Sequence, residues 1–179
     1  MSSSQDIEDI EVRIKNISEW DVSDDQTGKG ILLDTTRGII YTLLHNDPYE
    51  LTSKGVIWVS GASGGFNGPA RKMYSILSDA LVPNITSLRL NYRIPGNLTE
   101  CVMDTLAAVS FMAGIGHTDL VLVGHSFGGA TSVVASFKDN RIDACINLDG
   151  WLVVVPDNII NDGIVQDFMY IGQGEWWDE

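Results

Sequence analysis

The pattern of apolar and polar residues changes along the chain. In the first third, short segments such as 10–14 alternate apolar and polar residues, which is typical of strands with one face in water. From residue 55 onward, continuous apolar runs alternate with segments in which apolar residues recur every three or four positions. The runs indicate strands covered on both faces, and the longer period indicates amphipathic helices. The sequence therefore predicts an α/β protein whose mostly parallel sheet has helices on both faces and an antiparallel N-terminal edge.

Individual elements follow from the same pattern. Strands are predicted at 10–14, 31–33, 38–44, 55–59, 85–90, 120–123, 142–148 and 164–171. Helices are predicted after Pro69, after the capping sequence Asn97-Leu98-Thr99-Glu100, and after Ser126. In the first helix, the apolar stripe expected to face the core consists of Met73, Ile76, Leu77, Ala80 and Leu81.

Size and charge restrict the classes of function. The chain has 179 residues and a formal net charge of −13, and many of its acids lie near the N-terminus. We expect one domain over 10–179, preceded by a disordered acidic arm at 1–9. Association into a homo-oligomer is possible. The negative charge disfavours nucleic acid and anionic membranes as partners. No apolar run reaches the ~18 residues of a membrane span, and the polar start differs from a secretory signal, so a cytoplasmic location is expected.

The cysteines and glycines indicate neither a metal nor a cofactor. Cys101 and Cys145 stand alone within apolar segments, so two buried reduced thiols are predicted rather than a disulfide or a metal site. The glycine-rich loop at 61–65 lacks the lysine of a P-loop and the G-x-G-x-x-G spacing of a dinucleotide site. An oxyanion-binding loop, which needs only backbone N–H groups, fits this segment better.

The most informative stretch is 120–130, where an apolar strand runs into Gly124-His125-Ser126-Phe127-Gly128 and then into a helix. This spacing is that of the G-x-S-x-G nucleophile elbow, a strained turn that exposes a serine hydroxyl. The amide of Phe127, at the start of the helix, would face the negative oxygen formed when Ser126 attacks a carbonyl group. The alternative is a glycine-rich turn whose serine only caps the helix.

An acid follows the next predicted strand, in the pair Asp149-Gly150. The carboxyl end of a parallel strand is where α/β sheets place catalytic groups, although an Asp-Gly pair also forms simple turns. Of the three histidines, His45 and His117 are expected to be packing residues. His125 is expected to be oriented by the turn rather than toward Ser126.

The strand and helix alternation, the loop at 61–65 and the elbow resemble the α/β-hydrolase superfamily over about residues 30–171. Within it, the segments Gly-His-Ser-Phe-Gly-Gly-Ala-Thr at 124–131 and Asn-Leu-Asp-Gly-Trp at 147–151 are similar to platelet-activating-factor acetylhydrolase-like serine esterases. The segment at 87–93 looks more like bacterial hydrolases of the dienelactone hydrolase type.

The resemblance implies a set of site residues. Ser126 would be the nucleophile and Asp149 the triad acid. The oxyanion hole would be formed by the amides of Phe127 and of Ala62, or of Ser63 in place of Ala62. The substrate would be a small acyl ester, and no cofactor is implied.

The sequence departs from this family at the triad histidine. The triad order on this fold is serine, acid, histidine, and no histidine follows residue 125. We expect a serine hydrolase of small carboxylic esters or thioesters with an acyl-enzyme at Ser126, or a C-terminally shortened form of one. The alternatives are a catalytically silent binding protein and one half of an assembly whose partner supplies the histidine. A shortened sheet would expose an apolar edge, where aggregation can start.

Overall fold

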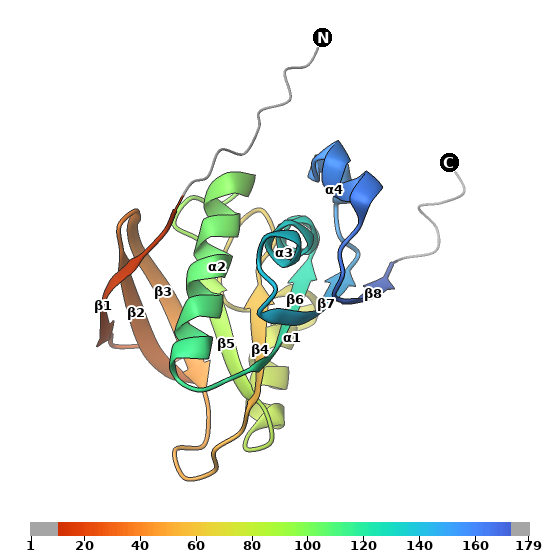
Figure 1. The fold of residues 1–179 in the computed structure, drawn as a ribbon. Helices are drawn as coiled ribbons and strands as arrows, with labels where there is room; N and C mark the ends of the chain where they lie inside the picture. The colour runs from red at the N-terminus through yellow and green to blue at the C-terminus, as the bar shows by residue number, and fades with distance from the viewer. Residues whose placement is uncertain (1–10, 173–179) are drawn as a thin grey trace.

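The computed structural model describes residues 11–172, so the arm predicted at 1–9 lies outside the described residues. Over this range the chain forms one eight-stranded sheet with helices packed on it (Figure 1). The strands are β1 (Ile14–Glu19), β2 (Lys29–Thr35), β3 (Gly38–His45), β4 (Lys54–Val59), β5 (Thr86–Asn91), β6 (Asp119–His125), β7 (Ile142–Leu148) and β8 (Asp167–Ile171). The helices are α1 (Pro69–Leu81), α2 (Leu98–Gly114), α3 (Phe127–Lys138), the 3-10 helix η1 (Leu152–Val154) and α4 (Asp157–Asp162).

The sheet has the strand order β1-β2-β3-β5-β4-β6-β7-β8. The strands β1, β2 and β3 are antiparallel, and β3 is also antiparallel to β5. The remaining neighbours, from β5 through β4, β6 and β7 to β8, are all parallel. Because α1, α2 and α3 connect successive parallel strands, this is the α/β arrangement that the hydrophobic pattern predicted, with the antiparallel strands at the N-terminal edge.

Two apolar clusters lie on opposite faces of the sheet. The larger cluster joins the sheet to α2 and α3, which pack against each other in front of the strands in Figure 1. The smaller cluster, between the sheet and α1, is built on Val56, Trp58, Tyr74 and Val123. The first predicted glycine-rich loop leads from β4 into α1 on one face, and the elbow leads from β6 into α3 on the other.

The first strand lies further along the chain than predicted. The alternation at 10–14 predicted a strand there, but β1 begins at Ile14 and pairs with β2 as far as Glu19. Before Ile14 the ladder ends irregularly, since the Arg13 amide donates to the Thr36 hydroxyl at 3.1 Å, beyond the end of β2. Alternation identifies a half-buried segment, but it does not show where the partner strand ends.

The stripe predicted to face the core from α1 is correct only in part. Met73 and Leu81 are half-buried and pack against the smaller cluster, whereas the middle of the stripe is exposed. Ile76 and Leu77 are 61% and 38% exposed, and the buried positions of this helix are Tyr74, Ser75 and Ser78. The Tyr74 ring packs on Trp58 with 5.0 Å between centroids, and its hydroxyl donates to the last carbonyl of β4 at 3.0 Å. Residues 70–72 have φ values of 51°, 56° and 73°, so the right-handed helix starts later than the pattern predicted.

The two edges of the sheet differ in chemistry. Ion pairs tie β1 and β2 together at the N-terminal edge, with Lys15 at 3.0 Å from Asp34 and Lys29 at 2.5 Å from Glu19. At the other edge all the residues of β8 are exposed, and most of them are apolar: Phe168, Met169, Tyr170 and Ile171. The described part of the sheet therefore ends in an apolar strand.

Both cysteines are buried, as predicted, and burial raises the pKa of each thiol to about 12. No helix in residues 11–172 is long and apolar enough to cross a membrane. Within the same residues, no group of three or more His, Cys, Asp or Glu side chains could hold a metal ion.

Candidate active site

Ser126 lies at a sharp turn between β6 and α3. Its φ of 55° and ψ of −122° are rare for any residue other than glycine, so the backbone at this position is strained. The turn is held by backbone hydrogen bonds: the Ser126 amide donates to Leu148 at 3.0 Å, and the Ser126 carbonyl accepts from Gly129 at 2.9 Å and Trp151 at 3.0 Å. The side chain of Ser126 is half-buried and stays accessible.

The glycines of the elbow are required by close packing. A Cβ at Gly124 would collide with the Gly128 carbonyl, and a Cβ at Gly128 would collide with the carbonyl oxygens of Val59 and Ser60. The first turn of α3 therefore rests directly on the end of β4, which only a residue without a side chain allows.

The glycine-rich loop after β4 lies beside the elbow. The Gly64 amide donates to the Gly61 carbonyl at 3.0 Å, which closes a turn with Ala62 and Ser63 at its centre. A Cβ built on Gly61 would be 3.9 Å from the Ser126 Cβ. The two glycine-rich segments, separate in the sequence, thus meet at the carboxyl edge of neighbouring parallel strands.

Unpaired amides flank Ser126. Among residues 11–172, the amides of Ala62, Ser63 and Phe127 donate no hydrogen bond, whereas those of Gly64, Gly65 and Ser126 do. The Phe127 amide is one of the unsatisfied donors that every helix leaves at its first turn. Backbone donors of this kind are suited to bind a negatively charged oxygen.

A cleft of about 440 Å³ opens in front of Ser126. It is lined by residues 61–69 together with His125 and Ser126, so most of its wall is backbone and small side chains. Its one large apolar wall residue, Phe66, stacks on Trp20 with 6.1 Å between ring centroids. This volume suits a small organic ligand.

Asp149 follows β7 and also has a positive φ, of 48°. Its amide donates to the Ile171 carbonyl in β8 at 2.7 Å, and Trp151, two residues later, donates to the Ser126 carbonyl. The Asp149 carboxylate is exposed, and no side chain or amide in residues 11–172 donates to it. The fold brings the acid turn to the elbow, but it leaves the carboxylate in solvent.

Two of the histidines lie away from Ser126. The buried His45 bonds Asp79 through Nδ1 at 2.8 Å and accepts at Nε2 from Arg89 Nε at 3.1 Å. Burial, followed by the Arg89 charge, lowers the His45 pKa. His117 bonds the Thr52 carbonyl through Nδ1 at 2.8 Å, and burial lowers its pKa as well.

His125 is the histidine that lines the cleft with Ser126, and it makes no hydrogen bond to the serine within the described chain. The packing role predicted for His45 and His117 agrees with their buried, bonded positions. The structure does not pair either of them with the elbow.

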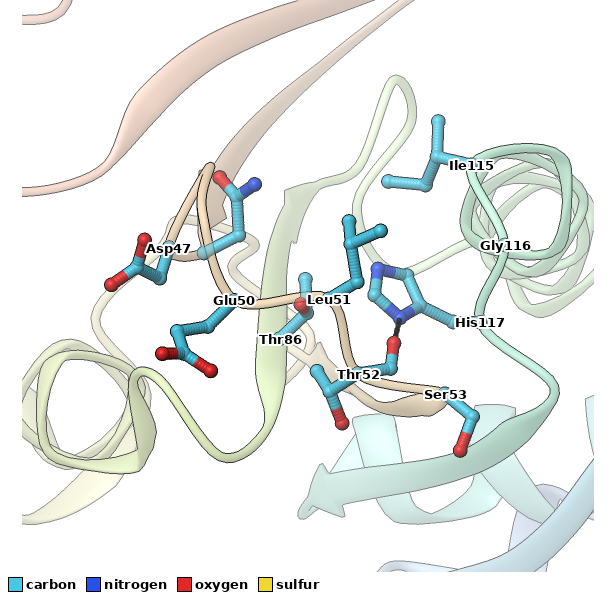
Figure 2. Close-up of a pocket in the computed structure, with 10 residues that line it drawn as sticks. Asp47, Glu50, Leu51, Thr52, Ser53, Thr86, Ile115, Gly116 and His117 are labelled. Carbon is cyan, nitrogen blue, oxygen red and sulfur yellow. Dashed lines mark hydrogen bonds between the residues drawn. The ribbon is translucent and has the colours of Figure 1, made fainter.

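A second cleft, of about 260 Å³, lies at the opposite end of the parallel strands (Figure 2). Its walls include two carboxylates and the His117 ring, but Figure 2 shows Asp47 and Glu50 on the far side of Leu51 from that ring. These groups do not converge on one point, so the cleft beside Ser126 is the better candidate active site.

Sequence reasoning missed the side chains that support the site. Arg89 and Asn91 of β5 bond to the glycine-rich loop, and the Tyr92 hydroxyl donates to the Ser60 carbonyl at 2.9 Å. Asn147 of β7 is fully buried, with its amide packed against Gly129 and Gly150. The polar residues within the apolar strand at 85–90 were the available signal, because a buried strand rarely carries them without a partner.

Comparison with known proteins defines the class of this fold. Similar solved structures include the esterase Est1E from Butyrivibrio proteoclasticus, at 20% identity and a TM-score of 0.58 over 72% of this chain and 53% of that one. The acetyl xylan esterase from Paenibacillus sp. R4 matches at 13% identity and a TM-score of 0.58, over 78% of this chain and 55% of that one. An alpha-beta serine hydrolase homologue from Coxiella burnetii matches at 17% identity and a TM-score of 0.60, over 84% of this chain and 89% of that one.

By its fold, the protein is an α/β-hydrolase-like protein, as the resemblance implied. Within that class, residues 93–178 match the family model of platelet-activating factor acetylhydrolase, isoform II. The matched part contains α2, the elbow and the acid turn. No curated protein matches the sequence. The chain spans about half the length of the two esterases above.

Proposed function

We propose that the protein is a serine hydrolase that acts on small carboxylic esters or thioesters through an acyl-enzyme at Ser126. One observation carries the proposal: Ser126 lies at a strained, accessible turn beside the unpaired amides of Ala62 and Phe127. The fold shared with esterases and the match of residues 93–178 support it.

In the proposed reaction, the Ser126 hydroxyl oxygen attacks the carbonyl carbon of the ester. The carbonyl oxygen becomes negative and accepts hydrogen bonds from the amides of Ala62 and Phe127, and the N-terminal end of α3 adds a favourable dipole. The tetrahedral intermediate then expels the alcohol or thiol, which takes up the proton lost by the Ser126 hydroxyl, and the acyl group stays on Ser126. Attack by water releases the acid and restores the serine.

The hydroxyl proton of Ser126 needs an acceptor, because a neutral serine is a weak nucleophile. No side chain in residues 11–172 is hydrogen-bonded to the Ser126 hydroxyl. In the proposal, the exposed Asp149 carboxylate orients an imidazole base that approaches the cleft from solvent. Without such a base, the acylation step would be slow.

Labelling with a fluorophosphonate probe followed by peptide mapping tests the proposal. We expect the probe on Ser126, and we expect Ser126→Ala to abolish the labelling. Ser53→Ala, which changes an exposed serine beside the second cleft, is the matched control and should keep full labelling. A folded wild-type protein without label on Ser126 would contradict the proposal.

The second candidate is a catalytically silent protein that keeps the cleft as a ligand site. The observation in its favour is the Asp149 carboxylate, which has no partner in residues 11–172. The same labelling experiment separates the two candidates, since a silent protein would stay unlabelled although its melting curve shows a cooperative fold.

A further inference from the structure

The glycine-rich loop has a free part and a bonded part. The turn at 61–64, centred on Ala62 and Ser63, presents amides that have no hydrogen-bond partner within the described chain. The two residues after this turn are hydrogen-bonded to β5: the Gly65 amide donates to Asn91 Oδ1 at 2.8 Å, and the Phe66 carbonyl accepts from Arg89 Nη1 at 3.3 Å. The Gly65 carbonyl also accepts from the Ser60 hydroxyl. The loop is therefore anchored on one side of the turn that would bind the oxyanion.

Arg89 and Asn91 reach the loop because of where they lie in the sheet. They are two residues apart in β5, so both side chains point to the same face. The strands β4 and β5 are parallel neighbours, and Trp58 of β4 is in register with Arg89. The loop that follows β4 consequently passes over the end of β5, where Asn91 is the last residue.

The loop backbone depends on this anchor. Gly64 and Gly65 have φ values of 69° and 87°, and glycine peptides can rotate at little energetic cost. A Cβ on Gly64 would be 2.9 Å from Asn91 Oδ1, so the loop wraps closely around this oxygen. With the oxygen removed, the Gly65 amide has no acceptor in the described chain. The turn would then be held only by its own Gly64–Gly61 bond and by the Ser60 hydroxyl on the Gly65 carbonyl.

Arg89 contacts the same loop from within the sheet. Its side chain is fully buried, and it donates to His45, to Gln26 Oε1 at 3.2 Å and to the Thr27 carbonyl at 2.6 Å as well as to Phe66. Because Arg89 has so many partners, its replacement would disturb several segments at once. Asn91 has the narrower role and is the better residue to test.

We propose that Asn91 is a positioning residue, which holds the Gly65 amide so that the turn at 61–64 presents the Ala62 amide to the oxyanion at Ser126. The inference depends on the proposed function, because it assigns Asn91 a role in acylation of Ser126. Asn91 itself does not touch the reacting atoms.

The rate of fluorophosphonate labelling at Ser126 tests the role, because phosphonylation would use the same serine oxygen and the same oxyanion-binding amides as acylation, without a later hydrolysis step. For Asn91→Ala we expect the maximal labelling rate to fall about tenfold, while the probe concentration at half-maximal rate changes less than twofold. Gly64→Ala, whose methyl group would displace the Asn91 oxygen, should lower the rate in the same way.

The matched control is Asp143→Ala. Asp143 Oδ2 accepts the Leu120 amide at 2.8 Å, so this variant removes the same kind of bond at the far end of the sheet. It should lower the melting temperature about as much as Asn91→Ala and leave the labelling rate unchanged. If Asn91→Ala and Asp143→Ala label at the wild-type rate, the positioning role is wrong although the proposed function stands. An unlabelled wild type would overturn both.

Discussion

The serine turn and the aspartate turn are built alike but supported differently. Each places a residue other than glycine at positive φ, 55° at Ser126 and 48° at Asp149. The serine turn is held by three backbone hydrogen bonds and by Gly128, which packs against the carbonyl oxygens of Val59 and Ser60 at the end of β4. The aspartate residue has one backbone bond, to the edge strand β8, and an exposed carboxylate. The proposed nucleophile and the amides beside it are thus held in place, whereas the carboxylate that would orient a base is exposed to solvent.

The largest difference in stability between the two turns is expected when one methyl group is added to a glycine in each. Gly128→Ala would press a Cβ against two backbone carbonyls, which cannot move independently, and should lower the free energy of unfolding by about 3 kcal/mol. Gly150→Ala would press a Cβ against the amide of the buried Asn147, which is a side chain and can shift more than backbone, so a smaller loss of about 2 kcal/mol is expected. Urea denaturation measures both values. Equal losses would show that the two turns are packed equally tightly.

Added imidazole should reveal the open base position. Because no side chain in residues 11–172 bonds the Ser126 hydroxyl, we expect ~0.1 M imidazole to raise the fluorophosphonate labelling rate about tenfold. The rate is followed by intact mass, with Ser126→Ala as the control for labelling at other residues. A rate independent of imidazole would indicate that a base already reaches the serine.

Relief of strain should stabilise the serine turn. Ser126→Gly removes the side chain from a φ/ψ region that favours glycine, at the cost of a more flexible unfolded chain, and should raise the free energy of unfolding by about 1 kcal/mol. Asp149→Gly should gain less, because aspartate tolerates left-handed φ better than serine. Thermal melting compares the two variants. If Ser126→Gly melts at a lower temperature than the wild type, the backbone at Ser126 is not strained.

The smallest change in stability is expected at the Asp149 carboxylate. Since the carboxylate is exposed and has no donor in residues 11–172, Asp149→Asn should change the free energy of unfolding by less than about 0.5 kcal/mol. The same variant should lower the imidazole-stimulated labelling rate about threefold, because the proposal assigns this charge to orienting the base. A large loss of stability would mean that the carboxylate supports the fold.

Local patterns predicted much of the fold. The strand at 142–148 agrees with β7, and the Asn97 side chain caps α2 by accepting the Glu100 amide at 3.1 Å, as the capping sequence indicated. Both features depend on residues that are close in the sequence. The buried face of α1 was predicted only in part, because its centre is occupied by Tyr74. The contact of Tyr74 with Trp58 on β4 decides this, and periodicity contains no information on that contact.

The candidate site shows the same division. The elbow could be predicted because its glycines, its serine and the flanking elements occur within a few residues. The site residues themselves, Ser126, Asp149, Ala62 and Phe127, stay a prediction of function. The anchor of the glycine-rich loop could not be predicted, since Asn91 and Gly65 meet only when β4 and β5 pair in parallel.

Opening of the edge strand β8 would affect the position of Asp149. It pairs only with β7 within the described residues, and all its side chains are exposed, so its amides should exchange with solvent sooner than those of the central strands. Each opening of β8 would release the Asp149 amide from the Ile171 carbonyl, while the Ser126 amide stays bonded to Leu148 in β7. Opening of this edge would therefore make the position of the Asp149 carboxylate less defined and leave Ser126 in place.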